Sequence, residues 1–396
     1  MYVYADNAAT TAVSKTALDA MLPMLTDCYG NPSSLHTIGQ KAAEKLSAAR
    51  ETFARYLNAQ PSEITFTSGG SEADNQAIVT AAVLGARKGK KHIISTAFEH
   101  HAVLHTLKKL EKEGYEVTLL QPEKDTGRIT VQQVKEALRP DTCLVTVMFA
   151  NNEIGTVLPI PEIGKLCREA GVLFHTDAVQ AAGHLPIDVQ AMDIDMLSLS
   201  AHKFHGPKGV GVLYARRGIF LTNIIEGGAQ ERGKRAGTEN MPGIVGAAAA
   251  FQDACDHMEA NAAHLIPLRD KLLRELSKIP HSVVNGDLTQ RLPGNVNLCF
   301  EGIEGESMLL LLDEKGIAAS SGSACTSGSL DPSHVLLAIG RPHEVAHGSL
   351  RLSLSEYNTQ EEIDYIISVM PGIVEYLRNM SPVWDELEHG QRKHLI

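Results

Sequence analysis

The chain has 396 residues, of which 43% are apolar and 21% are charged, as is usual for a folded globular protein. Its 36 basic and 47 acidic side chains give a formal net charge of −11, which argues against general binding to nucleic acid or to an anionic membrane. No run approaches the roughly 20 apolar residues of a bilayer span, and the first residues lack the pattern of a signal peptide. We therefore expect a cytoplasmic protein without direct nucleic-acid or membrane contacts.

Helix-like and strand-like segments alternate along the first 215 residues. A helical pattern over residues 40–57 is followed by a short strand at 64–67, a glycine turn and another helix. Further strands are predicted at residues 92–95, 116–120, 144–148, 172–175, 196–198 and 211–214, with helical patterns between most of the earlier ones. This alternation predicts a parallel or mostly parallel sheet that helices cover on both faces.

The pattern changes after about residue 235. One long Ala-rich helical region is predicted at 241–277, followed by strands near 296–300 and 349–354 and a closing helix at 360–378. Helices grouped with a few strands predict a smaller α+β domain. We assign residues 15–255 to a large domain, and residues 1–14 and 256–396 to a small one.

A glycine turn lies where the strand at 64–67 meets its helix. A helix N-terminus offers free N–H groups and the positive end of a dipole, so Gly70 and Ser71 are candidates for holding a phosphate. The spacing is not that of a Walker loop. A turn that only joins strand to helix is the alternative.

Two further candidates follow apolar strands. Asp177 stands at a strand end, where open α/β sheets bind ligands, although a helix N-cap would place an Asp there too. Lys203 lies among Ser, His and Gly residues, a setting that suits a nucleophilic amine better than a solvated surface charge. A phosphate site, a strand-end Asp and a lysine in this order resemble fold-type I pyridoxal-phosphate enzymes.

The cysteines indicate one reactive thiol and no disulfide framework or zinc ribbon, because their spacing is unpaired. Cys325 lies among small polar residues, which suits an exposed, reactive thiolate, although a plain polar loop is the alternative. We expect most of the others to be buried. The six are Cys28, Cys143, Cys167, Cys255, Cys299 and Cys325.

Two histidine pairs could suggest a metal, but we expect no fixed metal site. Residues 343–347 match the HExxH pattern of zinc proteases, yet they are confined between Pro342 and Gly348 just before a strand. His101 and His105 lie four residues apart on a predicted helix without an evident third ligand.

Taken together, these residues resemble those of NifS/IscS-type cysteine desulfurases, most of all NifS, almost from end to end. The SSGSACTSG sequence at residues 320–328 is typical of the long-loop class of this family. The other matching stretches are residues 6–11, 30–34, 99–100, 151–153, 177–180, 200–209, 230–233, 235–239 and Arg351. The resemblance implies an α/β, fold-type I transferase that uses pyridoxal 5′-phosphate and forms a homodimer.

The resemblance also implies roles for individual residues. Lys203 would bind the cofactor covalently and act as the base, His100 would stack on its ring, and Asp177 would pair with the ring nitrogen. The remaining implied cofactor contacts are Asn152 and Gln180 at the ring hydroxyl, and Gly70, Ser71, Ser200, His202 and the partner subunit's Thr238 at the phosphate. Arg351 would bind the substrate carboxylate, with Asn7 and Ala8 nearby.

The activity implied by the resemblance is conversion of L-cysteine to L-alanine. Cys325 would hold the sulfur as a persulfide and pass it to an iron–sulfur scaffold or another acceptor, and it would at most ligate a cluster transiently. A selenocysteine lyase or β-lyase on the same fold is an alternative, as is an inactive structural partner in an iron–sulfur assembly complex. The long cysteine-bearing loop argues against the lyases, and the joint presence of Lys203, Asp177, Cys325 and Arg351 argues against an inactive protein.

Overall fold

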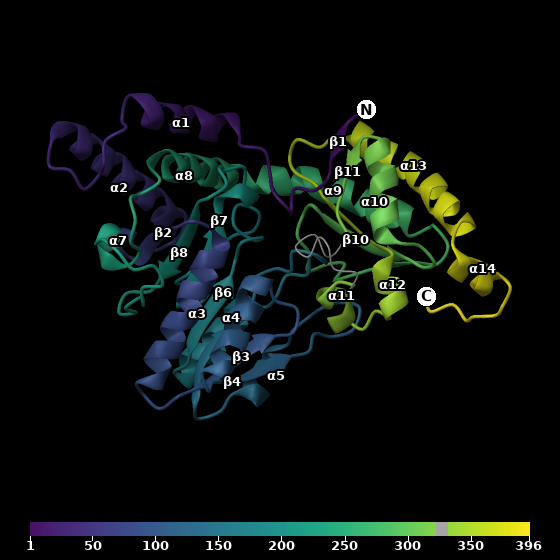
Figure 1. Ribbon diagram of the computed structural model, residues 1–396, viewed down its shortest axis with the longest axis horizontal. Coiled ribbons are helices and arrows are strands. Elements are labelled where there is room, and N and C mark those ends of the chain that lie inside the picture. Colours follow the sequence, from purple (N-terminus) through teal and green to yellow (C-terminus); the bar gives the residue numbers. More distant parts are fainter. Residues whose placement is uncertain (322–331) are drawn as a thin grey trace.

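The structure is a computed structural model that describes residues 1–321 and 332–396. Two parts lie side by side, and the helix α9 (Met258–Leu276) leads from the larger to the smaller (Figure 1). None of the helices in the described residues is long and apolar enough to cross a bilayer.

A seven-stranded sheet forms the centre of the larger part. Its order is β2-β8-β7-β6-β5-β3-β4, and the neighbours from β7 to β4 are parallel. Only β8 runs antiparallel to both of its neighbours in this sheet. The strands are β2 (Ile64–Thr67), β3 (His92–Thr96), β4 (Glu116–Leu120), β5 (Thr142–Thr146), β6 (Leu173–Asp177), β7 (Met196–Ser200) and β8 (Gly211–Ala215). The predicted mostly parallel α/β architecture is confirmed.

Helices cover both faces of this sheet because its strands are apolar on both sides. In β3, Ile94 packs into the core that includes Phe53 of α2 and Phe251 of α8, whereas Ile93 packs on the opposite face with α3 and α4. The helices of this part are α1 (Lys15–Thr26), α2 (Thr37–Leu57), α3 (Gly70–Ala86), α4 (His101–Lys112), α5 (Val131–Ala137), α6 (Ile160–Ala170), α7 (Gln230–Gly233) and α8 (Met241–Asp256). Short 3-10 turns occur at Pro61–Glu63 and Ala201–Lys203.

The smaller part is built on two small sheets with a separate apolar core. The antiparallel order β12-β10-β9 joins β9 (Ser282–Val284), β10 (Asn295–Phe300) and β12 (Ser349–Ser353). The N-terminal strand β1 (Val3–Tyr4) pairs in parallel with β11 (Ile317–Ala318). The other helices are α10 (Gly305–Glu314), α11 (His334–Ala338), α12 (His343–His347), α13 (Gln360–Asn379) and α14 (Pro382–Glu388).

The long helix predicted at 241–277 is two helices. The chain leaves helical geometry at His257, which ends α8 and begins α9. The core of the smaller part contains Val3 and Ala5 together with residues from 265 onward. Val335 and Leu336 of α11, in contrast, pack into the core of the larger part, and our domain assignment stays a prediction.

Candidate active site

A cavity of about 310 Å³ lies where β6 and β7 end and α3 begins. It brings together most of the residues singled out from the sequence. Those that line it are Ala8, Gly70, Ser71, His100, Asn152, Asp177, Gln180, Ser200, His202, Lys203 and Arg351. Asn7 lines a smaller adjoining cavity of about 40 Å³, which shares Ala8, Gln180 and Lys203 with the larger one. Thr238 is exposed and lines neither, and Cys325 lies outside the described residues.

The N-terminus of α3 forms one wall of the cavity, as the strand–turn–helix pattern predicted. The first-turn N–H groups of a helix have no partner within the helix, so they can bind an anion. A Cβ atom added at Gly70 would lie 2.7 Å from Cγ2 of Val179, closer than such atoms ever approach. Glycine therefore allows α3 to start against the segment that follows β6.

A pair of buried carboxyl groups lies on another wall. Burial raises the pKa of Asp177 to about 6, and the Val179 N–H and the charge of Lys203 partly oppose this increase. The same N–H donates to Asp177 Oδ1 over 2.9 Å, and the next residues form turns rather than the helix that an N-cap would need. Burial and the charge of Asp177 raise the pKa of Asp74 well above its usual range. Asp177, with its pKa of about 6, can therefore be ionised at neutral pH, and its charge favours the protonated form of Asp74.

The amine of Lys203 enters the cavity from the 3-10 turn after β7. Its Nζ donates to the backbone carbonyls of Ala8 and Ala9 over 2.6 and 2.8 Å. Gln180 Nε2 donates to the same Ala8 carbonyl over 3.1 Å. The N-terminal segment thus holds the lysine head group in the cavity and explains why Ala8 is found there.

Two histidines of the cavity have strongly lowered pKa values. Burial, and next the charge of Lys203, lowers the pKa of His100 to about 4, and the same two causes lower that of His202 to about 4. Both rings are therefore neutral at physiological pH. His100 Nδ1 accepts the N–H of Ala102 at the start of α4, which orients the ring. A neutral imidazole suits stacking on a flat ligand.

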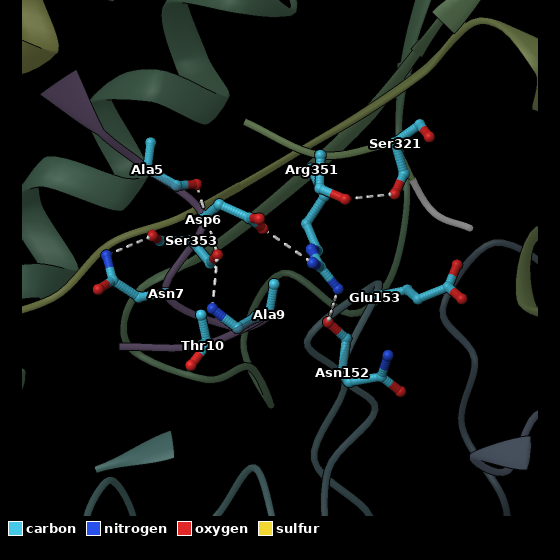
Figure 2. A network of polar contacts seen from close by, with 12 residues as sticks. Ala5, Asp6, Asn7, Ala9, Thr10, Asn152, Glu153, Ser321, Arg351 and Ser353 are labelled. Atoms are coloured by element: carbon cyan, nitrogen blue, oxygen red, sulfur yellow. Dashed lines mark hydrogen bonds and ion pairs between the residues drawn. The ribbon is translucent and has the colours of Figure 1, made fainter. Parts of the chain in front are cut away.

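Arg351 on β12 brings the smaller part into the cavity (Figure 2). Its guanidinium donates from Nη1 to the Asn152 carbonyl over 3.1 Å and from Nη2 to Asp6 Oδ1 over 3.0 Å. The side chain is 3% exposed, and its Nε has no hydrogen-bond partner within the described residues. A buried guanidinium with an unused N–H is suited to binding a carboxylate.

Residues 151–153 contact both Arg351 and Ser333, the residue before α11. Asn151 Oδ1 accepts the N–H groups of Glu153 and Ile154, so this turn is firmly held. The buried Glu153 accepts a hydrogen bond from Ser333, and burial raises its pKa to about 7. We predicted no role for Glu153 from the sequence, although it belongs to a stretch that matched the family.

Both histidine pairs that we set aside lie on helices in the structure. His343 and His347 do lie on a helix, the single turn α12, with ring centroids 4.6 Å apart. His101 and His105 stack at 5.0 Å on α4. Neither pair belongs to a cluster of three possible metal ligands in the part of the chain that is described.

The cavity fits pyridoxal phosphate by its donor set. The start of α3 with Ser71 and Ser200 can hold a phosphate, buried Asp177 can accept from a protonated ring nitrogen, and Lys203 supplies an amine. The fit rests on chemically distinct groups that the fold gathers from α3, β6 and β7.

Comparison with known proteins identifies the family. Residues 3–366 match the model of the class-V aminotransferase family. Over 387 residues the chain is 54% identical to cysteine desulfurase IscS of Clostridium botulinum strain Hall, with 97% of each chain covered. This chain belongs to the cysteine desulfurases of the class-V aminotransferase family.

Solved structures of similar proteins support the same family assignment. A NifS-like protein superposes with a TM-score of 0.89 at 38% identity, covering 95% of this chain and all of the other. A structure named SspA in complex with cysteine superposes with a TM-score of 0.79 at 40% identity, covering 90% of this chain and all of the other. The predicted resemblance to NifS/IscS-type cysteine desulfurases is therefore confirmed. The predicted fold-type I architecture is confirmed as well.

Proposed function

We propose that this protein is a pyridoxal-phosphate-dependent cysteine desulfurase that converts L-cysteine to L-alanine and retains the sulfur as a persulfide on Cys325. The observation that carries the proposal is the cavity that unites Lys203, Asp177 and Arg351 in one chain of this family. The structure named SspA in complex with cysteine, 40% identical, supports cysteine as the substrate.

Pyridoxal phosphate, when bound, supplies an electron sink for the α-carbon of the amino acid. Asp177, ionised above its pKa of about 6, holds a proton on the ring nitrogen, and neutral His100 packs on the ring. Lys203 removes and returns the proton at the substrate α-carbon. The remaining proposed contacts are Gly70, Ser71, Ser200, His202 and the partner subunit's Thr238 at the phosphate, and Asn152 and Gln180 at the ring hydroxyl.

Arg351 binds the substrate carboxylate, with Asn7 and Ala8 beside it. The buried guanidinium already donates to Asp6 and Asn152, and its Nε–H, which has no partner among the described residues, is available to a carboxylate oxygen. A substrate bound there has its α-carbon in the same cavity as the Lys203 amine.

The sulfur-transfer step uses the thiolate of Cys325. It attacks the sulfur of the substrate, a new S–S bond forms, and the C–S bonding pair returns to the β-carbon, which takes a proton to become the methyl group of alanine.

Five cysteines lie in the described residues and none forms a disulfide. Free thiols are typical of a reducing compartment, and this supports a cytoplasmic location.

The experiment that tests this function is Cys325→Ser. This variant should still bind L-cysteine, but release of sulfide and alanine should fall to near background because a hydroxyl is a far weaker nucleophile than a thiolate. Mass spectrometry of the cysteine-treated parent should find the added sulfur on the Cys325 peptide alone. Cys28→Ser, at a half-buried cysteine outside the cavity, is the control and should keep parental activity.

Two outcomes would change the proposal. Full activity in Cys325→Ser would indicate direct β-elimination by a lyase. Purified protein without the yellow colour and without a borohydride-fixed lysine adduct would indicate an inactive structural partner. Sulfide and alanine assays with and without candidate acceptor proteins would identify the acceptor, which we propose to be an iron–sulfur scaffold or a related sulfur carrier.

A further inference from the structure

Two histidines and a glutamate converge on the smaller part, and none of them lines the catalytic cavity. His281 precedes β9, Glu301 follows β10, and His394 lies in the segment after α14. One possible ligand atom from each lies within 4.8 Å of the others, and this is the one cluster of three or more such residues in the described residues. The three come together only in the folded chain.

Glu301 carries the buried carboxylate of this cluster. Its side chain is 4% exposed, and its ion-pair partners among the described residues are His394, 2.9 Å from Oε2, and His281, 3.6 Å away. Burying a carboxylate is costly unless it is paired or binds a metal.

The surroundings hold two of the three residues in place. Arg378 on α13 donates to the backbone carbonyls of Glu301 and His281 over 3.1 and 3.0 Å, and the charge of Glu301 partly opposes the lowering of the Arg378 pKa by burial. The guanidinium also lies 3.9 Å from the ring centre of Trp384. Trp384 in turn contacts both histidine rings edge-on, at 5.4 and 5.5 Å. The Arg378 hydrogen bonds fix the backbone at Glu301 and His281.

The hydrogen bonds at the two rings are ones that a metal can replace. The rings stack with centroids 3.7 Å apart and planes 18° apart. His281 Nδ1 is bonded to the Ile396 carbonyl over 2.9 Å, and His394 Nδ1 to Glu301 Oε2 over 2.9 Å. A metal bound at both Nδ1 atoms requires the rings to turn and the Nδ1 protons to move to Nε2.

We propose that His281, Glu301 and His394 bind a zinc ion that fastens the C-terminal segment 389–396 to the ends of β9 and β10. Two imidazole nitrogens and one carboxylate oxygen are ligands that Zn²⁺ accepts, and a water molecule completes a tetrahedral set. Glu301 Oε1 also accepts the Leu395 N–H over 2.6 Å, so the same carboxylate holds the backbone of this segment. Zinc binding here would contradict our expectation of no fixed metal site.

The test is zinc binding by the full-length holoenzyme, free of any affinity tag. All variants carry Cys325→Ser, which removes the proposed reactive thiol as a competing ligand. Equilibrium dialysis against Zn²⁺ with elemental analysis should find one bound ion per chain of the Cys325→Ser protein. Adding His394→Ala should weaken the binding of that ion at least about tenfold. His389→Ala is the matched control, because His389 lies in the same segment but contacts Asp385 instead of Glu301.

Two further measurements keep the test decisive. In the Cys325→Ser background, Zn²⁺ should slow tryptic cleavage at Arg392 and Lys393. It should do the same when His389→Ala is added, but not when His394→Ala is added. Replacement of Zn²⁺ by Co²⁺ should give the visible absorption of a tetrahedral site that His281→Ala lacks. If His281→Ala fails to fold, the zinc affinity of His394→Ala, on the terminal segment, still tests the proposal. Equal zinc affinity and stoichiometry in His394→Ala and His389→Ala would overturn the proposal.

Discussion

Glu99 is buried next to the cavity residue His100, and only one of its carboxyl oxygens has a hydrogen-bond partner among the described residues. Oε1 accepts hydrogen bonds from Thr96 and from the Met148 N–H over 2.8 and 2.9 Å, whereas Oε2 has no partner among the described residues. Burial raises the pKa of Glu99 to about 8, and the charge of Asp177 adds to this increase. The folded protein therefore keeps a proton at Glu99 that the unfolded chain releases above about pH 4.5.

This difference predicts how Glu99→Gln changes stability with pH. Because the folded-state pKa is raised, the parent loses stability as pH rises from about 4.5 to about 8, and glutamine avoids that loss. At about 1.4 kcal/mol per pKa unit, the variant should be more stable by about 5 kcal/mol at pH 9 and nearly equal to the parent at pH 4. Urea unfolding of the cofactor-free proteins measures this. Glu111→Gln, at an exposed position of α4, should show no such difference, and a Glu99→Gln gain independent of pH would contradict the assignment.

Lys203 offers a second prediction at this scale. Lys203→Ala should abolish turnover and leave pyridoxal phosphate bound without a covalent bond, because the α3 N-terminus, Asp177 and His100 remain. Denaturation and dialysis should then remove all the cofactor, as absorbance of the dialysate would show. Desulfurase activity at the parental level would exclude Lys203 as the base.

Single residues of the cavity were predictable where a local pattern carried the signal. Asp177 and Lys203 follow apolar strands, and Gly70 starts a helix, so each could be placed from its neighbours. Asp6 and Asp74 were missed. Asp6 matters through its contact with Arg351, 345 residues away, and Asp74 through its burial beside Asp177. Neither property is visible in the flanking sequence.

At the scale of elements, the close approach of α3 to the turn after β6 gives a testable steric prediction. Gly70→Ala should weaken cofactor retention by about an order of magnitude, since its methyl group would collide with Val179 and displace the helix start. The double variant Gly70→Ala/Val179→Ala should recover much of this loss. Cofactor release on dilution, followed by absorbance, provides the comparison, with Val179→Ala alone as the control. Parental retention in Gly70→Ala would show that the helix start does not need a glycine.

Element boundaries were predicted less well than element types. The strand expected at 144–148 is Thr142–Thr146, because apolar residues continue into the buried segment after the strand. The direction of β8 was not resolved, since apolar runs in parallel and antiparallel strands look alike. The Gly206-Pro207 turn between β7 and β8 is the local signal that could have indicated a reversal.

At the scale of the whole molecule, we predict a homodimer whose second subunit completes the phosphate site. Thr238 is exposed in the single chain and lies between α7 and α8, outside the cavity. Thr238→Ala should weaken cofactor retention without changing the subunit number measured by sedimentation. A monomer that still binds pyridoxal phosphate tightly would refute this arrangement.

The N-terminal strand has a consequence for the order in which the protein is made. β1 pairs with β11, and Ala8 and Ala9, a few residues after β1, hold the Lys203 amine. At 5–20 residues per second, a ribosome needs on the order of 15 to 60 s to advance from residue 9 to residue 318. The strands from β2 to β8 are complete long before then, whereas the first strand waits for its partner. Nascent chains should therefore hold a formed central sheet with an open catalytic cavity, and acquire cysteine-processing ability only near release.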